Sequence, residues 1–218
     1  MKKGFILTLL MGLVMSFASC SGCSKGDINA KDSLSIDSVT AEVTLDVDHI
    51  IAVDRQTMYA KFKDSYRWYE TCMRLPEFLD SENVTSEPTI LVNIFQSIEI
   101  LDGGADTYVW KFQHFPDGTV NVDSIHSFWI EDNPLNDNVI KFNYKAAFDR
   151  MMQSNFPKPH SKNVTLRNPL GPVNINAQWI FGNIHEQLWV DAVTGDVRNS
   201  NPAYPEEKGF KMPLGEWP

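Results

Sequence analysis

The chain has 218 residues, of which 43% are hydrophobic and 11% aromatic, a composition that supports a packed core and excludes general disorder. Its formal net charge at pH 7 is -9, and an acidic surface repels phosphate backbones, so we expect no nucleic-acid partner. The length allows one large domain or two small ones.

The first 19 residues have the pattern of an export signal. Two lysines follow Met1, then comes an apolar run, and small residues precede a cysteine. The apolar run is too short to span a bilayer. The stretch Phe17-Ala-Ser-Cys20 resembles a bacterial lipobox, in which the cysteine receives a diacylglyceryl group and its new amine is acylated after cleavage. We therefore expect lipidation at Cys20, with Cys23 as the alternative position and a plain secretory leader as the competing interpretation.

Residues 20–44 are predicted to be the lipidated cysteine followed by a flexible tether, because they are rich in Ser, Asp, Lys and Gly and hold few large apolar side chains. Asp32-Ser-Leu34 and Asp37-Ser-Val39 resemble O-glycosylation sites in exported proteins of the Bacteroidetes. The predicted location is the cell envelope, at the outer membrane on its periplasmic or surface side. There the lipid alone contacts the membrane.

Residues 45–133 are predicted to form an N-terminal α+β unit. From Asp46 to Leu79 apolar residues recur at the three-and-four spacing of a helix, and Cys72 falls on this buried stripe as an inert thiol. Asp46, Asp48 and Asp54 cluster at the start of this helix, where carboxylates interact favourably with its dipole. Three strands are predicted to follow, over residues 89–100, 107–115 and 119–130.

Residues 134–200 repeat this order in shorter form, with a helix predicted over 143–153 and strands over 163–167, 177–181 and 187–193. One helix followed by an antiparallel meander, ending in Val190-Asp-Ala-Val-Thr-Gly-Asp-Val197, resembles the C-terminal half of a PepSY domain. PepSY-like domains accompany secreted peptidases as inhibitory or chaperoning segments and also occur alone in periplasmic lipoproteins. The resemblance implies a binding or inhibitory module.

The predicted fold class is therefore α+β, an antiparallel sheet or sheets with helices packed on one face, arranged as tandem helix-plus-three-strand (PepSY-like) units. The competing arrangement is one continuous antiparallel sheet with both helices on one face, and the sequence alone does not separate the two. Residues 201–218 are predicted to be an extended C-terminal tail, since the region from 199 onward holds four prolines.

The sequence predicts no enzyme, no cofactor and no metal site. The three cysteines and five histidines lack the spacing of a metal cluster, although His114 and His126 could approach each other across the turn at residues 116–118. Neither a nucleophile elbow nor a glycine-rich phosphate loop is present, so we assign no catalytic residues.

Trp179 and Trp189 are the candidate partner-binding residues, because exposed aromatics on a sheet are typical anchors; the alternative is that both pack in the core. We expect a non-catalytic cell-envelope lipoprotein that acts as a protein-binding or peptidase-inhibitor-like module, with an envelope protein as its partner. The alternative function is a surface accessory lipoprotein that binds a glycan or a small ligand. A groove in which polar groups accompany the tryptophans would favour the ligand, and a flat hydrophobic sheet face would favour the protein.

Overall fold

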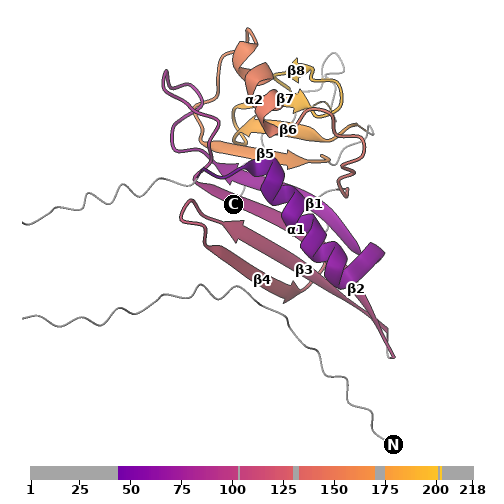
Figure 1. The fold of residues 1–218 in the computed structure, drawn as a ribbon. Helices are drawn as coiled ribbons and strands as arrows, with labels where there is room; N and C mark the ends of the chain where they lie inside the picture. The colour runs from indigo at the N-terminus through magenta and orange to yellow at the C-terminus, as the bar shows by residue number, and fades with distance from the viewer. Residues whose placement is uncertain (1–43, 103, 130–132, 170–174, 201, 203–218) are drawn as a thin grey trace, which may run out of the picture. The chain divides into compact units, whose positions relative to one another are not determined.

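The computed structural model describes residues 44–102, 104–129, 133–169, 175–200 and 202. These residues belong to one compact unit, which spans residues 41–218. Its elements in chain order are α1 (Val47–Phe62), the 3-10 helix η1 (Lys63–Ser65), β1 (Tyr66–Arg74), β2 (Ile90–Leu101), β3 (Gly104–His114), β4 (Val120–His126), α2 (Tyr144–Gln153), β5 (Asn163–Arg167), β6 (Gln178–Gly182), β7 (Gln187–Asp191) and β8 (Val197–Arg198) (Figure 1).

The eight strands form one antiparallel sheet in the order β4-β3-β2-β1-β5-β6-β7-β8. Strand β1 lies at its centre, where Thr71 pairs with Asn93 of β2 on one side and with Leu166 of β5 on the other. The central strand therefore joins the strands predicted for the N-terminal unit to those predicted for the C-terminal unit.

The predicted fold class, an α+β arrangement of tandem helix-plus-three-strand units, is wrong. The described residues hold two α-helices beside one sheet of eight strands, so the fold is mainly antiparallel sheet. The error comes from β1, which the apolar spacing assigned to a long helix. This strand has neighbours on both sides and buries four consecutive residues, 68–71, so its burial lacks the alternation that marks a half-exposed strand.

Both helices lie against the same face of the sheet, each over different strands. Asp54 of α1 contacts Asn93 of β2, and Phe148 of α2 packs against Phe181 of β6 with ring centroids 6.2 Å apart. The two contacted strand residues lie on the same face of the sheet. This follows from the strand pairing, which runs from β2 through β1 and β5 to β6, because directly paired residues share a face. Between the helices the strand residues on this face are also buried, since Thr71, Leu166 and Trp179 are each at most 1% exposed.

Each helix begins at a side-chain cap. The Asp46 carboxylate accepts the His49 N–H at 3.1 Å at the start of α1, and the Asn143 side chain accepts the Ala146 N–H at 3.0 Å at the start of α2. The helix predicted over 143–153 is thus confirmed, with Asn143 as the capping residue. Three- and four-residue spacing gives each helix one buried side. The buried residues are Val47, Ile51, Asp54 and Met58 on α1 and Tyr144, Ala147, Phe148 and Met151 on α2.

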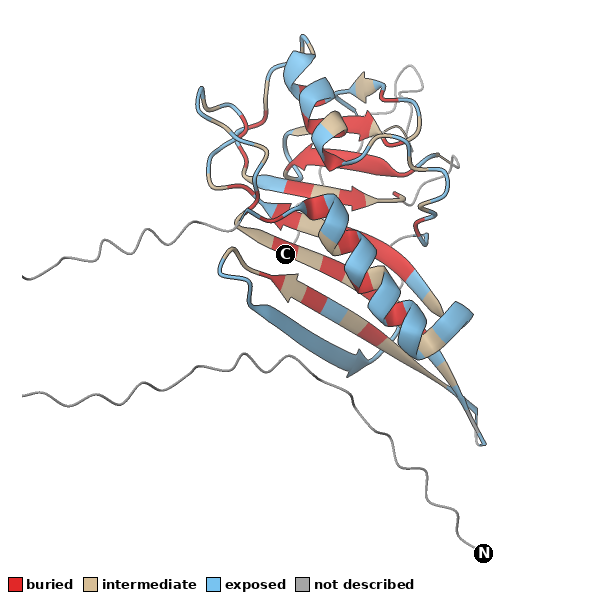
Figure 2. Cartoon of the chain, viewed as in Figure 1, coloured by how far each residue is buried: buried red, intermediate tan, exposed pale blue. Residues whose placement is uncertain are grey.

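Burial differs between the strands of the sheet (Figure 2). All five residues of β6 are buried, whereas all seven residues of β4 are exposed. Strand β4 is also the end of the strand order, with a partner on one side only among the described residues. The sheet therefore presents one fully exposed edge strand.

Candidate functional site

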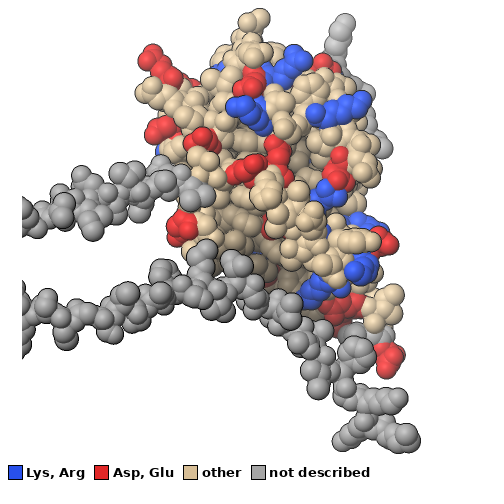
Figure 3. Space-filling model, in the orientation of Figure 1, with Lys and Arg blue, Asp and Glu red and all other residues tan. Residues whose placement is uncertain are grey.

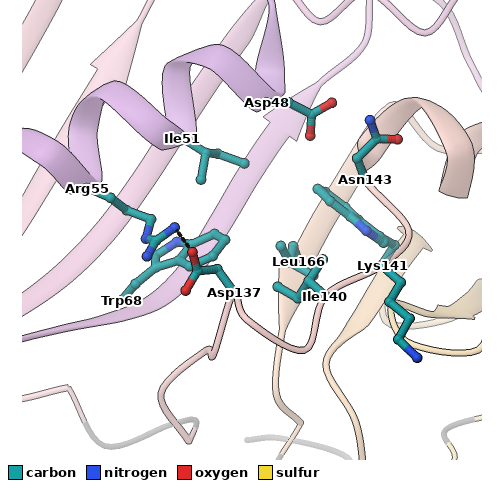
Figure 4. A pocket seen from close by; sticks show the side chains of 10 residues that line it. Asp48, Ile51, Arg55, Trp68, Asp137, Ile140, Lys141, Asn143 and Leu166 are labelled. Atoms are coloured by element: carbon teal, nitrogen blue, oxygen red, sulfur yellow. Dashed lines mark hydrogen bonds and ion pairs between the residues drawn. The ribbon is translucent and has the colours of Figure 1, made fainter.

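A cavity of about 160 Å³ lies between α1 and the segment that connects β4 to α2, of which residues 127–129 and 133–143 are described (Figure 4). Its floor is formed by β1, β5 and β6. Its lining residues are Asp48, Ile51, Arg55, Trp68, Asp137, Ile140, Lys141, Asn143, Leu166 and Trp179.

Two indole rings form the aromatic part of the cavity wall, and hydrogen bonds hold both. The Trp68 Nε1–H donates to Thr71 Oγ1 at 3.2 Å, and the Trp179 Nε1–H donates to the Phe142 carbonyl oxygen at 2.8 Å. Since both indole donors are bound to the protein, the tryptophans offer a ligand apolar and π surface. Ile51, Ile140 and Leu166 make the remainder of this wall apolar.

An ion pair closes one side of the cavity. The Arg55 guanidinium bonds the Asp137 carboxylate, and it also lies 5.6 Å from the Trp68 ring centroid. The ion pair joins α1 to the connecting segment, and its two residues are 82 positions apart in the chain. The charge of Arg55 is thereby neutralised at this side.

Asp48 stands at the other side of the cavity, in the first turn of α1. Its Oδ1 accepts the Tyr144 N–H at a long 3.4 Å, which places the carboxylate at the N-terminus of α2. Desolvation raises the pKa of this carboxyl above its ordinary value; the Tyr144 N–H opposes the shift and the Asp46 charge adds to it. The described residues give Asp48 no cationic partner.

Two further hollows, of about 350 and 380 Å³, adjoin the cavity along α1. Arg55 lines all three hollows, and Tyr59 and Tyr66 line both of the larger ones. Arg55 therefore stands where the cavity meets two larger hollows beside the helix.

A chain of buried polar groups lies under α1 and ends at the cavity wall. The Asp54 carboxylate accepts from Asn93 Nδ2 at 2.7 Å and lies 2.8 Å from His114 Nε2. Thr71 Oγ1 donates to Asn93 Oδ1 at 2.5 Å and receives the indole hydrogen of Trp68. The network fixes the orientation of Trp68, and its members satisfy one another in the core.

A glycine packs against Phe142, the residue whose carbonyl holds the second indole ring. Gly195 has φ of +77°, and a Cβ at this position would overlap the ring of Phe142. Phe142 in turn supplies the carbonyl that holds Trp179. The turn before β8 therefore needs a residue without a side chain for two reasons, the left-handed backbone and the contact with Phe142.

The structure places both predicted partner-binding tryptophans inside the protein. Trp179 is 1% exposed and Trp189 is 2% exposed. They lie on opposite faces of the sheet, because Trp179 pairs with Val190 and Trp189 pairs with Ile180. Trp179 lines the cavity and Trp189 does not, so neither presents an exposed ring to a flat partner surface.

Cys72, His114 and His126 do not line the cavity. Cys20 and Cys23 are outside the described residues. Cys72 is a half-buried free thiol 2.8 Å from Glu70, and burial raises its pKa, with the Glu70 charge adding to the shift. His114 and His126 do not meet, because they pair with β4 and β3 residues at opposite ends of the same hairpin.

The residues that sequence reasoning missed are the charged ones around the cavity. Asp48 was interpreted as a helix-start acid, while Arg55 and Asp137 had no local pattern. Figure 3 shows acidic and basic side chains interspersed over the face that carries the helices. No broad field of one sign marks the site, so individual groups decide which ligand it can take.

No protein-family model, curated protein or solved structure matches the chain. Among the residues that the structure describes, no helix has the length and apolar character needed to cross a membrane. The same residues contain no group of three or more His, Cys, Asp or Glu side chains arranged to hold a metal ion.

Proposed function

We propose that the protein is a non-catalytic lipoprotein of the cell envelope that binds a small ligand in the cavity between α1 and the connecting segment. The observation that carries this proposal is the composition of the cavity wall. It combines two oriented indole rings and three aliphatic side chains with a few charged groups, which is the usual make-up of a small-molecule site. The leader and Cys20 support the envelope location.

The chemistry of the lining favours binding without catalysis. The lining residues include no Ser, Thr, Cys or His, so the cavity offers no hydroxyl or thiol nucleophile beside a base. Neither carboxylate of the lining stands beside a nucleophile, since Asp137 is bound to Arg55 and Asp48 accepts a backbone N–H. These charged groups can orient a bound ligand.

Filling the cavity tests the proposal. Ile140→Trp adds a ring at a half-buried lining position, and Val139→Trp adds the same ring at the neighbouring exposed position, which lies outside the lining. Benzyl alcohol, a neutral probe with one aromatic ring, is titrated against both variants and the unaltered protein, and binding is followed by saturation-transfer NMR. We expect the unaltered protein and Val139→Trp to bind the probe and Ile140→Trp to lose it.

The proposal fails if benzyl alcohol does not bind the unaltered protein, or if Ile140→Trp binds it as well as Val139→Trp does. Thermal unfolding of both variants provides the folding control. An Ile140→Trp protein that melts near the unaltered temperature yet no longer binds locates the probe in the cavity.

A second candidate function, protein binding, is favoured by strand β4. All seven of its residues are exposed, and its outer edge has no strand partner among the described residues. Ile125 is 61% exposed on the strand, and Phe128, just beyond its end, is 66% exposed. A partner that presents an extended strand could pair its main chain with β4 and cover these side chains.

This second function is tested by a charge on the exposed strand. Ile125→Lys and Asn121→Lys place the same charge on the same face of β4, but only the first removes an apolar side chain. An envelope protein that is captured by the unaltered chain and by Asn121→Lys, and lost with Ile125→Lys, would support pairing at this edge. Equal capture by both variants would exclude it.

A further inference from the structure

We propose that the ligand of the cavity is a small organic cation, an ammonium group on an aromatic or branched apolar body, with the Asp48 carboxylate as its anchor. This inference rests on the proposed function, because it names the chemical class that the same cavity takes.

Among the described residues, Asp48 is the carboxylate of the lining without an ion pair, because the other carboxylate, Asp137, is bound to Arg55. The lining holds two cations, Arg55 and Lys141, and Arg55 is engaged by Asp137. Figure 4 shows the Lys141 side chain extending away from Asp48. Asp46, two residues earlier, adds a second negative charge near the same place. The Asp48 side of the cavity is therefore electronegative, which favours a cationic group over an anionic one.

The hydrogen bonds of Asp48 leave acceptor capacity for a ligand. Its carboxylate has two oxygens and roughly four lone-pair sites. One oxygen accepts the Tyr144 N–H at 3.4 Å, longer than an ordinary N–H···O bond, and the described residues supply no second donor. A primary ammonium has three donors and can bond this carboxylate while its carbon chain stays in the cavity.

The walls suit the remainder of such a ligand. Trp68 is 5% exposed and Trp179 is 1% exposed, so each contributes a small area of ring to the wall, and their N–H groups are already bonded to Thr71 and Phe142. An indole ring attracts a cation through its π face and also packs well against an aromatic ring. Ile51 adjoins Asp48 on α1 one turn along, so apolar surface begins directly beside the anchor.

The response to pH follows from the carboxyl group. Asp48 is an exposed residue, but partial desolvation of its carboxyl raises its pKa, so this group takes up a proton at a higher pH than an ordinary aspartate. A cationic ligand needs the ionised form of this carboxyl. Binding of the cation is therefore present above the raised pKa and is lost as the pH falls through it. The titratable and charged groups around Asp48 are the N-cap residue Asp46, Arg55 on α1, Tyr144 on α2, and Asp137 and Lys141 on the connecting segment.

Three probes of one ring and different charge test the inference: benzylammonium, benzyl alcohol and benzoate. We expect affinity to fall in that order at pH 7, with benzylammonium about tenfold tighter than benzyl alcohol, since a charge-assisted bond is the stronger kind. Asp48→Asn keeps the acceptor for the Tyr144 N–H and removes the charge, so it should abolish the preference for the ammonium. Asp149→Asn removes one charge from the exposed side of α2, away from the lining, and should keep it.

The outcomes separate this inference from the proposed function. If benzyl alcohol binds and benzylammonium binds no tighter, or if Asp48→Asn retains the ammonium preference, the cavity stands and the ligand class is overturned. Tighter binding of benzoate would overturn it in favour of an anion that displaces Asp137 from Arg55. If none of the three probes binds, the proposed function and this inference both fall.

Discussion

Replacing Asp54 with alanine tests the buried polar network that holds α1 and Trp68 in place. Asp54 is 3% exposed, and its carboxylate accepts from Asn93 Nδ2 and lies within hydrogen-bond distance of His114 Nε2. Alanine removes the acceptor and leaves two buried polar groups without it. Each orphaned group costs about 1–3 kcal/mol, so the sum is about 2–6 kcal/mol.

The surroundings narrow this range. Asn93 is fully buried and cannot recruit water, whereas His114 is 8% exposed and can turn toward solvent. We therefore expect the lower part of the range, a loss of about 2–4 kcal/mol in the free energy of unfolding. A domain of this kind is stable by only about 5–15 kcal/mol, so the loss is a large share of the total.

Urea denaturation followed by tryptophan fluorescence measures the change. Asp64→Ala is the matched control, because Asp64 is exposed on η1 and the bond to Arg67 uses its backbone carbonyl. This control should change the stability by less than about 0.5 kcal/mol. Asp54→Asn keeps an acceptor for Asn93 and should lose less than Asp54→Ala does. If Asp54→Ala costs no more than Asp64→Ala, the network does not stabilise the fold and the reasoning is refuted.

Two further predictions concern backbone strain and thiol reactivity. Gly195→Ala should lower the free energy of unfolding by about 1–3 kcal/mol, because it adds both backbone strain at positive φ and overlap with Phe142. The control is Gly118→Ala, which is also at positive φ but has open space around its Cβ, and it should cost less stability in the same thermal melts. Equal losses of stability in the two variants would exclude the Phe142 contact as a cause. The second prediction uses a protein in which Cys20 and Cys23 are changed to serine, so that Cys72 is the one remaining thiol. Cys72 should react with iodoacetamide at pH 8.5 far more slowly in the folded protein than in urea, because burial raises its pKa and lowers its thiolate fraction. Equal reaction rates in the two states would show that the folded thiol is accessible and ionised.

The positions of most elements could be predicted from the sequence, because their patterns are local. The strand predicted over 163–167 is confirmed without change as β5, and the alternating run from 89 to 100 is confirmed as β2 within one residue at each end. The start of α2 follows from Asn143, whose side chain caps the first turn. These features depend on residues within a few positions of one another.

The architecture could not be predicted because it depends on β1. Its apolar residues fit a helical stripe, and only the pairing with both β2 and β5 makes this segment a strand. The same limit applies to the tryptophans. The alternation of residues shows which neighbours within its own strand share a face with each tryptophan. Only the pairing of Trp179 with Val190 shows that Trp179 and Trp189 lie on opposite faces of the sheet.

The candidate site was hidden for a related reason. Asp48 meets Tyr144 across 96 positions, and Arg55 meets Asp137 across 82. No spacing rule connects residues so far apart, and each alone has an ordinary role on a helix or in a loop. The lipid at Cys20 and the PepSY-like character of residues 142–197 stay predictions from the sequence.

The most direct test of the central claim, that the cavity between α1 and the connecting segment binds a small ligand, is the ¹H–¹⁵N spectrum of the indole N–H groups during titration with benzylammonium. The protein has six tryptophans, and Trp68 and Trp179 line the cavity while Trp110 lies on β3 and donates to Ser97. The account predicts saturable shifts of the Trp68 and Trp179 signals and an unchanged Trp110 signal. Unchanged Trp68 and Trp179 signals at saturating probe, or equal shifts of all three, would contradict it.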